Sequence, residues 1–298
     1  MNINTMVSLA VNGISMGMIY ALMAMGLILL IRAIGVMNFA QGDLLMFGAF
    51  ITCWLTVDLK LPLWAMIPIS MLCFAVVGIV FMFTAYWPLR NATYPAATVI
   101  STMGAAMALK EIATLVWGSL PRSMPSLMKN AKNGKAAVLK IGTISIQWQF
   151  ILTIIVGAVF IFLVFVLFDK LYAGRMMQAA AQDKYAAELL GIPTILTTMA
   201  TYVIVVALAS TGGYMIAPIF MVSNTLGTLQ LRAFAGVVIG GVGNIKGAIL
   251  GSLIIGLVEA FSTIQFSQYK DAVVFLVMIA FLLVRPQGLF GEKIADKA

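Results

Sequence analysis

The chain has 298 residues, of which 62% are hydrophobic and only 9% are charged, and its mean hydropathy is +1.07. Soluble domains contain about 45–50% apolar and about 25% charged residues, so a soluble fold could not bury this much apolar surface. The net charge of +8 must lie in loops and at helix ends, where it indicates lipid headgroups rather than nucleic acid as the partner. With no histidine and only two cysteines, both in apolar segments, the chain offers no metal cluster and no histidine-based acid–base catalysis.

Apolar segments recur along the whole chain, and most are long enough to cross the hydrocarbon core, which takes about 20 helical residues. They do not alternate as the strands of a membrane β-barrel do, so they predict an all-α, polytopic transmembrane helical bundle. The expected spans are 6–31, 40–57, 62–87, 95–118, 147–168, 194–216, 230–244, 247–263 and 271–284. The seventh is short and glycine-rich, which predicts about 8–9 spans with broken or re-entrant helices in a single membrane domain, residues 1–298.

Two interruptions of the apolar pattern resemble each other. Asn38 and Asn244 each follow a glycine by three residues, precede another glycine and open an apolar helix. Matching interruptions in two halves of a membrane protein often mark a pathway built from broken helices. Asn38 and Gln41 could cap such a break, and Asp43 could stabilise the positive end of the following helix. The alternative is a pair of ordinary helix ends at the membrane surface.

Charged residues inside the predicted spans need partners. Lys110 and Glu111 lie in the fourth span, and Glu259 lies near the end of the eighth. Adjacent residues on a helix point about 100° apart, so Lys110 and Glu111 cannot share one face. Intramembrane charges often mark function. Pairing with another helix, snorkelling and a role in transport all stay open for these residues.

Two charged loops face opposite sides of the membrane, because one predicted span separates them. The loop 119–146 has five basic residues and no acidic one: Arg122, Lys129, Lys132, Lys135 and Lys140. The loop 174–193 carries both signs, and its alanine-rich centre predicts a small amphipathic helix over Met176–Leu190. That helix could lie on the headgroups or dock into a groove of a partner. Lys and Arg are almost evenly divided between the two sides, so charge alone does not orient the chain.

Three motifs follow one another along the chain. The first is Gly35-Val-Met-Asn-Phe-Ala-Gln-Gly-Asp43, the second is Ala179-Ala-Ala-Gln-Asp183 followed by Leu189-Leu-Gly191, and the third runs from Arg232 through Gly247. The second resembles the loop by which permeases of bacterial ABC importers touch their ATPases. The first and third resemble the signatures of branched-chain amino acid permeases, in the family's order. The family often has histidine where Gln41 stands, a change that keeps hydrogen bonding but not protonation.

The resemblance implies a multi-pass permease subunit of the bacterial inner membrane, with its N-terminus outside and its C-terminus inside. Residues 174–193 would then be a cytoplasmic coupling helix, and residues 119–146 an extracytoplasmic loop. The implied partners are two ATPase subunits, a second homologous permease chain in a heterodimer, and a soluble binding protein. The implied substrate is a branched-chain amino acid (Leu, Ile or Val), although related systems carry other amino acids, urea, amides and small carboxylates.

The chain itself has no Gly-x-x-x-x-Gly-Lys-Ser/Thr phosphate loop, so we expect no catalytic residue and no cofactor in it, and ATP and Mg²⁺ would bind to the partner subunits. Three sets of functional residues are expected from the motifs. ATPase coupling is expected of Arg175, Gln182, Asp183, Glu188, Leu190 and Gly191. Lining of the translocation path is expected of Asn38, Phe39, Gln41, Gly42 and Asp43. Helix breaking and close packing are expected of Gly240, Gly241, Gly243, Asn244, Gly247 and Gly251.

An ion-coupled secondary transporter or channel for a small organic solute is the alternative function. It would use Asp43, Glu111 or Glu259 as its ion or proton site. It would leave the motif from Ala179 to Gly191 without a role. An intramembrane enzyme is less favoured, because the sequence lacks histidine, a metal cluster and an evident Ser–Lys or paired-Asp arrangement.

Overall fold

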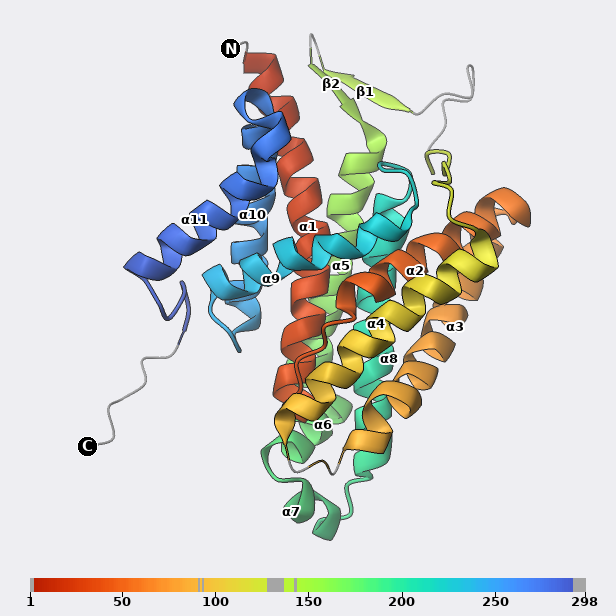
Figure 1. Ribbon diagram of the computed structural model, residues 1–298, viewed down its shortest axis with the longest axis vertical. Helices are drawn as coiled ribbons and strands as arrows, with labels where there is room; N and C mark the ends of the chain where they lie inside the picture. Colours follow the sequence, from red (N-terminus) through yellow and green to blue (C-terminus); the bar gives the residue numbers. More distant parts are fainter. Residues whose placement is uncertain (1–2, 91, 93, 128–136, 142–143, 292–298) are drawn as a thin grey trace.

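The computed structural model describes residues 3–90, 92, 94–127, 137–141 and 144–291. Within these residues, seven helices are long and apolar enough to cross a membrane (Figure 1). They are α1 (Ile3–Ile34), α3 (Leu63–Phe81) with its continuation to Leu89, α4 (Pro95–Trp117), α5 (Trp148–Lys170), α8 (Thr194–Ile216), α10 (Ile245–Gln265) and α11 (Lys270–Val284) with the short turn before it. The predicted polytopic helical bundle is therefore confirmed.

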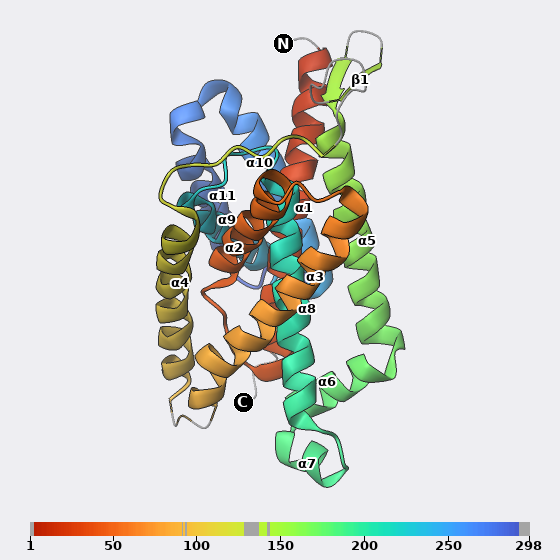
Figure 2. The same ribbon diagram turned by 90° about the vertical axis from the view of Figure 1, so that its right-hand side faces the viewer.

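Two expected spans are shorter helices. Helix α2 (Gln41–Cys53) continues into one π-helical turn, Trp54–Asp58, and α9 (Leu229–Gly240) has only 12 residues. At 1.5 Å per residue, α9 is about 18 Å long, less than the hydrocarbon core of about 30 Å. Helix α2 begins at mid-height beside α1, after a non-helical stretch, and α9 ends in a turn (Figures 1 and 2). These two are the broken helices of the bundle.

The two charged loops lie at opposite ends of the molecule (Figures 1 and 2). The end that holds the N-terminus also holds β1 (Val138–Ile141) and β2 (Ile144–Gln147), which pair antiparallel. The sequence pattern does not predict this hairpin, because its strands are only four residues long. The other end holds α6 (Tyr172–Gln182) and α7 (Lys184–Leu189). Of the basic residues in the first loop, Lys129, Lys132 and Lys135 lie outside the described residues.

Helix α1 forms the centre of the bundle. From Ile19 to Leu30 its apolar side chains have exposed fractions of 4% or less. A helix that is apolar on every side must be surrounded by others, and α5, α8, α9 and α10 pack around it. The approach of α10 is especially close, because a Cβ on Gly256 would overlap the backbone of Gly13 and Gly17. Small residues at this crossing hold the two backbones together.

We predict that Gly256→Ala lowers the thermal stability of the purified chain, because the added methyl group overpacks the α1–α10 crossing and costs about 1–3 kcal/mol. The measurement is the thermal midpoint at which buried Cys53 becomes available to a thiol-reactive dye. Gly104→Ala is the matched control, since a Cβ there meets nothing within 4 Å. Equal midpoints for the two variants would contradict the close crossing.

Candidate functional site

The N-terminus of α2 is buried inside the bundle, where its free N–H groups need partners from the protein. The Asn38 Oδ1 accepts a hydrogen bond from the Ala40 N–H at 2.9 Å, and Gln230 Oε1 of α9 accepts one from the Gly42 N–H at 2.8 Å. Gln230 Nε2 also donates to the Asn38 carbonyl at 3.4 Å, and Asn38 Nδ2 donates to Gln41 Oε1 at 3.3 Å. One glutamine side chain therefore joins the two broken helices.

The five residues expected to line a path come together at this junction, and most of them are packed. Asn38, Gln41 and Asp43 have exposed fractions of 4% or less. Gln41 Nε2 donates to a backbone carbonyl of α8 at 3.4 Å. The cavity beside Asn38 and Phe39 holds about 10 Å³, no more than one water molecule. In this structure the segment is a hydrogen-bonded joint, and its role in lining a path stays a prediction.

An ion pair fixes the first turn of α2 to α4. Asp43 Oδ1 lies 3.5 Å from Lys110 Nζ, and the carboxylate also stands at the positive end of the α2 dipole. The Lys110 side chain is 40% exposed, whereas that of Asp43 is only 6% exposed. Nearby, Asn224 Nδ2 donates to Thr114 Oγ1 at 2.6 Å, which attaches α4 to the turn before α9. Asp43 and Lys110, which lie in the second and fourth predicted spans, are thus paired with each other.

The turn between α9 and α10 depends on glycine and asparagine. Gly241 and Gly243 have φ of +103° and +94°, a region that side chains with a Cβ rarely adopt. Asn244 Oδ1 accepts a hydrogen bond from the Gly247 N–H at 3.2 Å and so caps α10. Arg32, at the end of α1, donates from Nε to the Gly243 carbonyl at 2.6 Å. The turn is held by its own backbone geometry and by α1.

The remaining glycines of this set bring α9 and α10 into backbone contact. A Cβ on Gly240 would overlap the backbone of Gly247, and one on Gly251 would overlap the backbone of Gly236. The six residues expected to break and pack helices therefore all lie in this hairpin.

The last carbonyl groups of α9 are satisfied by the segment that follows α11. The Leu289 N–H donates to the Ile239 carbonyl at 2.8 Å, and the Phe290 N–H donates to the Gly240 carbonyl at 3.0 Å. A helix that ends inside a membrane protein needs such partners, because lipid provides none. Sequence reasoning missed this role, because nothing in the segment 285–291 marks it as a partner for a helix end.

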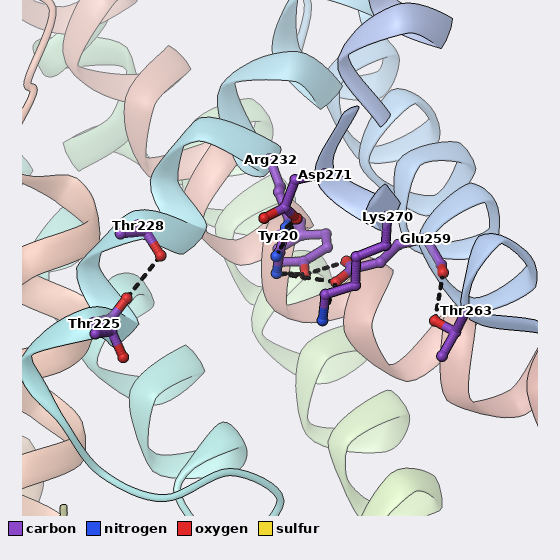
Figure 3. A network of polar contacts seen from close by, with 8 residues as sticks. All are labelled: Tyr20, Thr225, Thr228, Arg232, Glu259, Thr263, Lys270 and Asp271. Atoms are coloured by element: carbon purple, nitrogen blue, oxygen red, sulfur yellow. Dashed lines mark hydrogen bonds and ion pairs between the residues drawn. The ribbon is translucent and has the colours of Figure 1, made fainter. Parts of the chain in front are cut away.

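A charge network surrounds Glu259, in which Glu259 and Arg232 are largely buried and Asp271 is exposed (Figure 3). Its Oε1 lies 3.0 Å from Arg232 Nη1, and its Oε2 accepts a hydrogen bond from the Tyr20 hydroxyl at 2.5 Å. Arg232 Nη2 also contacts Asp271 Oδ1 at 2.5 Å, and Lys270 Nζ lies 3.9 Å from Glu259 Oε1. The five residues come from α1, α9, α10 and α11, and their two positive and two negative charges balance. Of the readings left open for Glu259, the structure shows ion pairing.

The segment expected to be one amphipathic helix over Met176–Leu190 is two helices, and the prediction of a single helix was wrong. Asp183 has extended backbone angles, φ −151° and ψ 106°, and its Oδ1 accepts a hydrogen bond from the Ala186 N–H at 3.0 Å. The aspartate therefore caps α7 instead of continuing α6, because its short side chain competes for backbone N–H groups. Gly191, with φ +79°, ends the segment.

The residues expected to contact an ATPase lie on the surface of this segment. Arg175, Gln182, Asp183, Glu188, Leu190 and Gly191 are all exposed. Glu188 Oε1 additionally accepts a hydrogen bond from Thr194 Oγ1 at 2.6 Å, which connects α7 to α8. Three large apolar side chains project from the same end, with exposed fractions of 73%, 72% and 81% for Tyr185, Leu189 and Leu190. Exposed apolar groups gathered at one place mark an interaction surface.

A cavity of about 480 Å³ adjoins α6 and the turn before α10. It is lined by Arg32, Gln178, Gln182 and Lys246, and on its other side by apolar residues of α5. The cavity thus lies between the surface segment and the start of α10.

An ion pair at the opposite end of the molecule was missed by sequence reasoning. Arg122 Nη1 and Nη2 donate to the two carboxylate oxygens of Asp58 at 2.9 Å each. The hydrogen bond raises the pKa of Arg122, and the paired backbone of Arg122 and Val222 adds two further hydrogen bonds. The loop after α4 is therefore fastened to the end of α2 and to the loop before α9.

We predict that Arg232→Met strongly destabilises the chain, by about 3–5 kcal/mol, because it leaves Glu259 buried without its closest cation. Glu259→Gln should cost less, since the amide oxygen still accepts the hydrogen bond from Tyr20. The measurement is thermal unfolding in detergent. The control is Arg285→Met, because Arg285 is exposed and its substitution removes the same charge. Equal stability of the Arg232 and Arg285 variants would show that the network contributes nothing.

Comparison with known proteins shows which family the sequence matches. The family described as "Branched-chain amino acid transport system / permease component" matches residues 9–282. The high-affinity branched-chain amino acid transport system permease protein LivH of Escherichia coli K12 is 30% identical, and the corresponding protein BraD of Pseudomonas aeruginosa is 32% identical. Each alignment covers 96% of this chain and 96% of the relative.

Two further matches are also named as transport permeases. The probable branched-chain amino acid transport permease protein LivH of Methanocaldococcus jannaschii is 25% identical over 91% of this chain and 88% of its own. A probable ABC transporter permease protein, y4mJ of Sinorhizobium fredii, is 40% identical over 30% of this chain and 29% of its own. Because the family match covers nearly all of the sequence, this chain belongs to the family of permease components of branched-chain amino acid transport systems.

Proposed function

We propose that this chain is the membrane-spanning permease subunit of an ATP-driven importer in the bacterial inner membrane. In this proposal it forms part of the translocation path for a branched-chain amino acid, which a soluble binding protein delivers from outside. Two ATPase subunits bind ATP and Mg²⁺, and a second homologous permease chain completes the path. The single observation that carries the proposal is the family match over residues 9–282, together with relatives whose names state this transport system.

The exposed end formed by α6 and α7 supports the ATPase contact. The side chains of Tyr185, Leu189 and Leu190 are strongly exposed. Helix α7 lies at the end of the molecule, at an angle to α6, and Asp183 caps it (Figure 2). An amphipathic element that inserts apolar side chains into a partner's groove has this form. We therefore propose residues 174–193 as the cytoplasmic coupling element, now as two helices joined at Asp183. The loop 119–146, at the other end of the molecule, then faces the binding protein.

The connections of α6 suggest how ATPase closure could reach the membrane part. Gly174 packs against the end of α5, where a Cβ would overlap the backbone of Leu167. Gln178 Nε2 donates to the Phe168 carbonyl at 2.9 Å, so α6 moves with α5. Glu188 is hydrogen-bonded to the first residue of α8. A rigid movement of the coupling element would therefore pull on α5 and α8, which pack against the central helix α1.

Charge reversal in the coupling element tests the proposal. We predict that the double variant Asp183→Arg and Glu188→Arg loses most of the co-purifying ATPase subunits while it retains the second permease chain. The measurement is quantitative mass spectrometry of what co-purifies with the tagged chain from its native host in mild detergent. Asp183→Asn should retain the ATPases better, because the amide oxygen can still cap α7 at the Ala186 N–H.

The control is Gln265→Arg, which adds one positive charge at the exposed last residue of α10, a helix that ends near the other end of the molecule (Figure 1). It should leave ATPase recovery unchanged. If the unmodified chain purifies without any nucleotide-binding subunit under all conditions, the importer proposal fails. If the charge-reversed variant keeps its ATPases, only the assignment of the coupling element fails.

A further inference from the structure

Helix α4 presents an exposed face that runs along its length. Eight exposed residues recur at intervals of three and four and so share one side of the helix: Ile100, Met103, Gly104, Met107, Ala108, Glu111, Ile112 and Leu115. Apart from its contacts with α2, the end of α3 and the turn before α9, α4 has no helix packed against it in the described part of the chain. We call these eight residues the α4 stripe.

The α4 stripe contains a charge that has no partner among the described residues. Glu111 makes no ion pair or hydrogen bond there through its carboxylate, whereas its neighbour Lys110 contacts Asp43. Glu111 lies six residues before the end of α4, about 9 Å along the helix axis, and inside the segment Ala96–Trp117 that is long and apolar enough to cross a membrane. Helical side chains lean toward the N-terminus, so this carboxylate leans toward the bilayer centre and away from the nearer surface. A lipid-facing carboxylate in this position is strongly unfavourable.

The same stripe has the small residues that allow two membrane helices to approach. Gly104 and Ala108 are four residues apart, and a Cβ on Gly104 meets nothing within 4 Å. Elsewhere in this chain, glycines of this spacing are covered by another helix, as in the α9–α10 hairpin. A groove of about 520 Å³ between α3 and α4 continues the stripe, because Gly104, Ala108 and Ile112 line it. The stripe thus has two small residues that let another helix approach closely, and the carboxylate of Glu111 lies one helical turn after them.

Other exposed membrane faces of the chain differ from the stripe. Between their charged end residues Asp271 and Lys170, α11 and α5 expose apolar side chains, such as Leu276, Ile279 and Leu283 of α11 and Ile155 and Phe162 of α5. Apolar faces without charge suit contact with lipid chains, whereas polar groups in membrane helices usually face protein or water. Among the described spans, the α4 stripe is therefore the exposed face that is least suited to contact with lipid.

The charges of α4 also indicate what kind of chain covers it. Lys110 contacts Asp43 and points about 100° away from Glu111, so it does not neutralise the Glu111 carboxylate. In a pair of chains related by a two-fold axis along the membrane normal, equivalent residues lie at the same depth. A homologous chain that packs its corresponding helix on the α4 stripe would therefore place its own side chains at the depth of Glu111, where a cation or an N–H donor could pair with the carboxylate.

We infer that the α4 stripe is the surface on which the second permease chain packs, with Glu111 paired to a cationic or N–H-bearing side chain of that chain. This inference rests on the proposed function, because it takes the second permease chain from it. It adds the residues of the contact, which neither the family match nor the relatives' names provide.

Site-specific photocrosslinking tests the inference. A benzophenone amino acid replaces Met107 on the stripe in one variant and Leu276 on α11 in the control; both positions are strongly exposed and apolar. The tagged complex is irradiated in native membranes, and the crosslinked products are identified by mass spectrometry. We expect a crosslink to a second permease chain from position 107 and crosslinks to lipid from position 276. Crosslinks from 107 to lipid alone, or to the second chain only from 276, would overturn the inference.

Substitution of Glu111 gives an independent readout. Glu111→Leu should lower the recovery of the second permease chain at least about tenfold, because it leaves the partner's donor unpaired, whereas Glu111→Gln should retain more. The purified chain should remain monodisperse, since leucine suits a lipid-exposed position. Unchanged recovery with Glu111→Leu contradicts the inference but leaves the proposed function intact. If no second permease chain accompanies even the unmodified chain, the proposed function fails as well.

Discussion

Lipid offers no hydrogen bonds to the backbone, and this constraint explains the arrangement of the two broken helices. The beginning of α2 and the end of α9 both lie within the bundle, so each must find its partners in the protein. Gln230 of α9 serves the first end, through the Gly42 N–H, and the backbone of Leu289 and Phe290 serves the second. Because the Gln230 side chain of α9 accepts a hydrogen bond from the first turn of α2, the two broken helices depend on each other. A movement of α9 would therefore alter α2 directly.

The charges inside the membrane follow a similar logic. Asp43 is paired with Lys110, and Glu259 is paired with Arg232 and linked to Tyr20. Both pairs join a broken helix to an intact one, so their structural role is to hold α2 and α9 in place. An ion-coupled transporter would need one of these carboxylates to bind and release an ion, and their existing cationic partners do not favour that use. Glu111 differs from both, because its partner is absent from the described part of the chain.

Much of this fold could be predicted from the sequence, because length and hydropathy reveal a membrane span directly. The two broken helices could also be expected, since glycine and asparagine interrupt apolar runs at matching positions. What could not be predicted were the partners, such as Gln230 for Gly42 and Tyr20 for Glu259, because these contacts join residues about 190 and 240 positions apart. Charged partners did carry a signal, because Lys110, Arg232 and Glu259 all lie within predicted spans. The break at Asp183 was missed because a strong helical pattern on both sides hid the capping potential of one aspartate.

The central claim is that Gln230 accepts the hydrogen bond of the Gly42 N–H at the buried beginning of α2. Amide hydrogen exchange tests this claim most directly. The chain would be reconstituted in lipid nanodiscs, and exchange would be followed by mass spectrometry for peptides covering residues 38–44 and 285–291. The account predicts slow exchange in both peptides, and selective acceleration of the first when Gln230 is changed to Leu. Fast exchange of residues 38–44 in the unmodified chain, or no change with Gln230→Leu, would contradict the account.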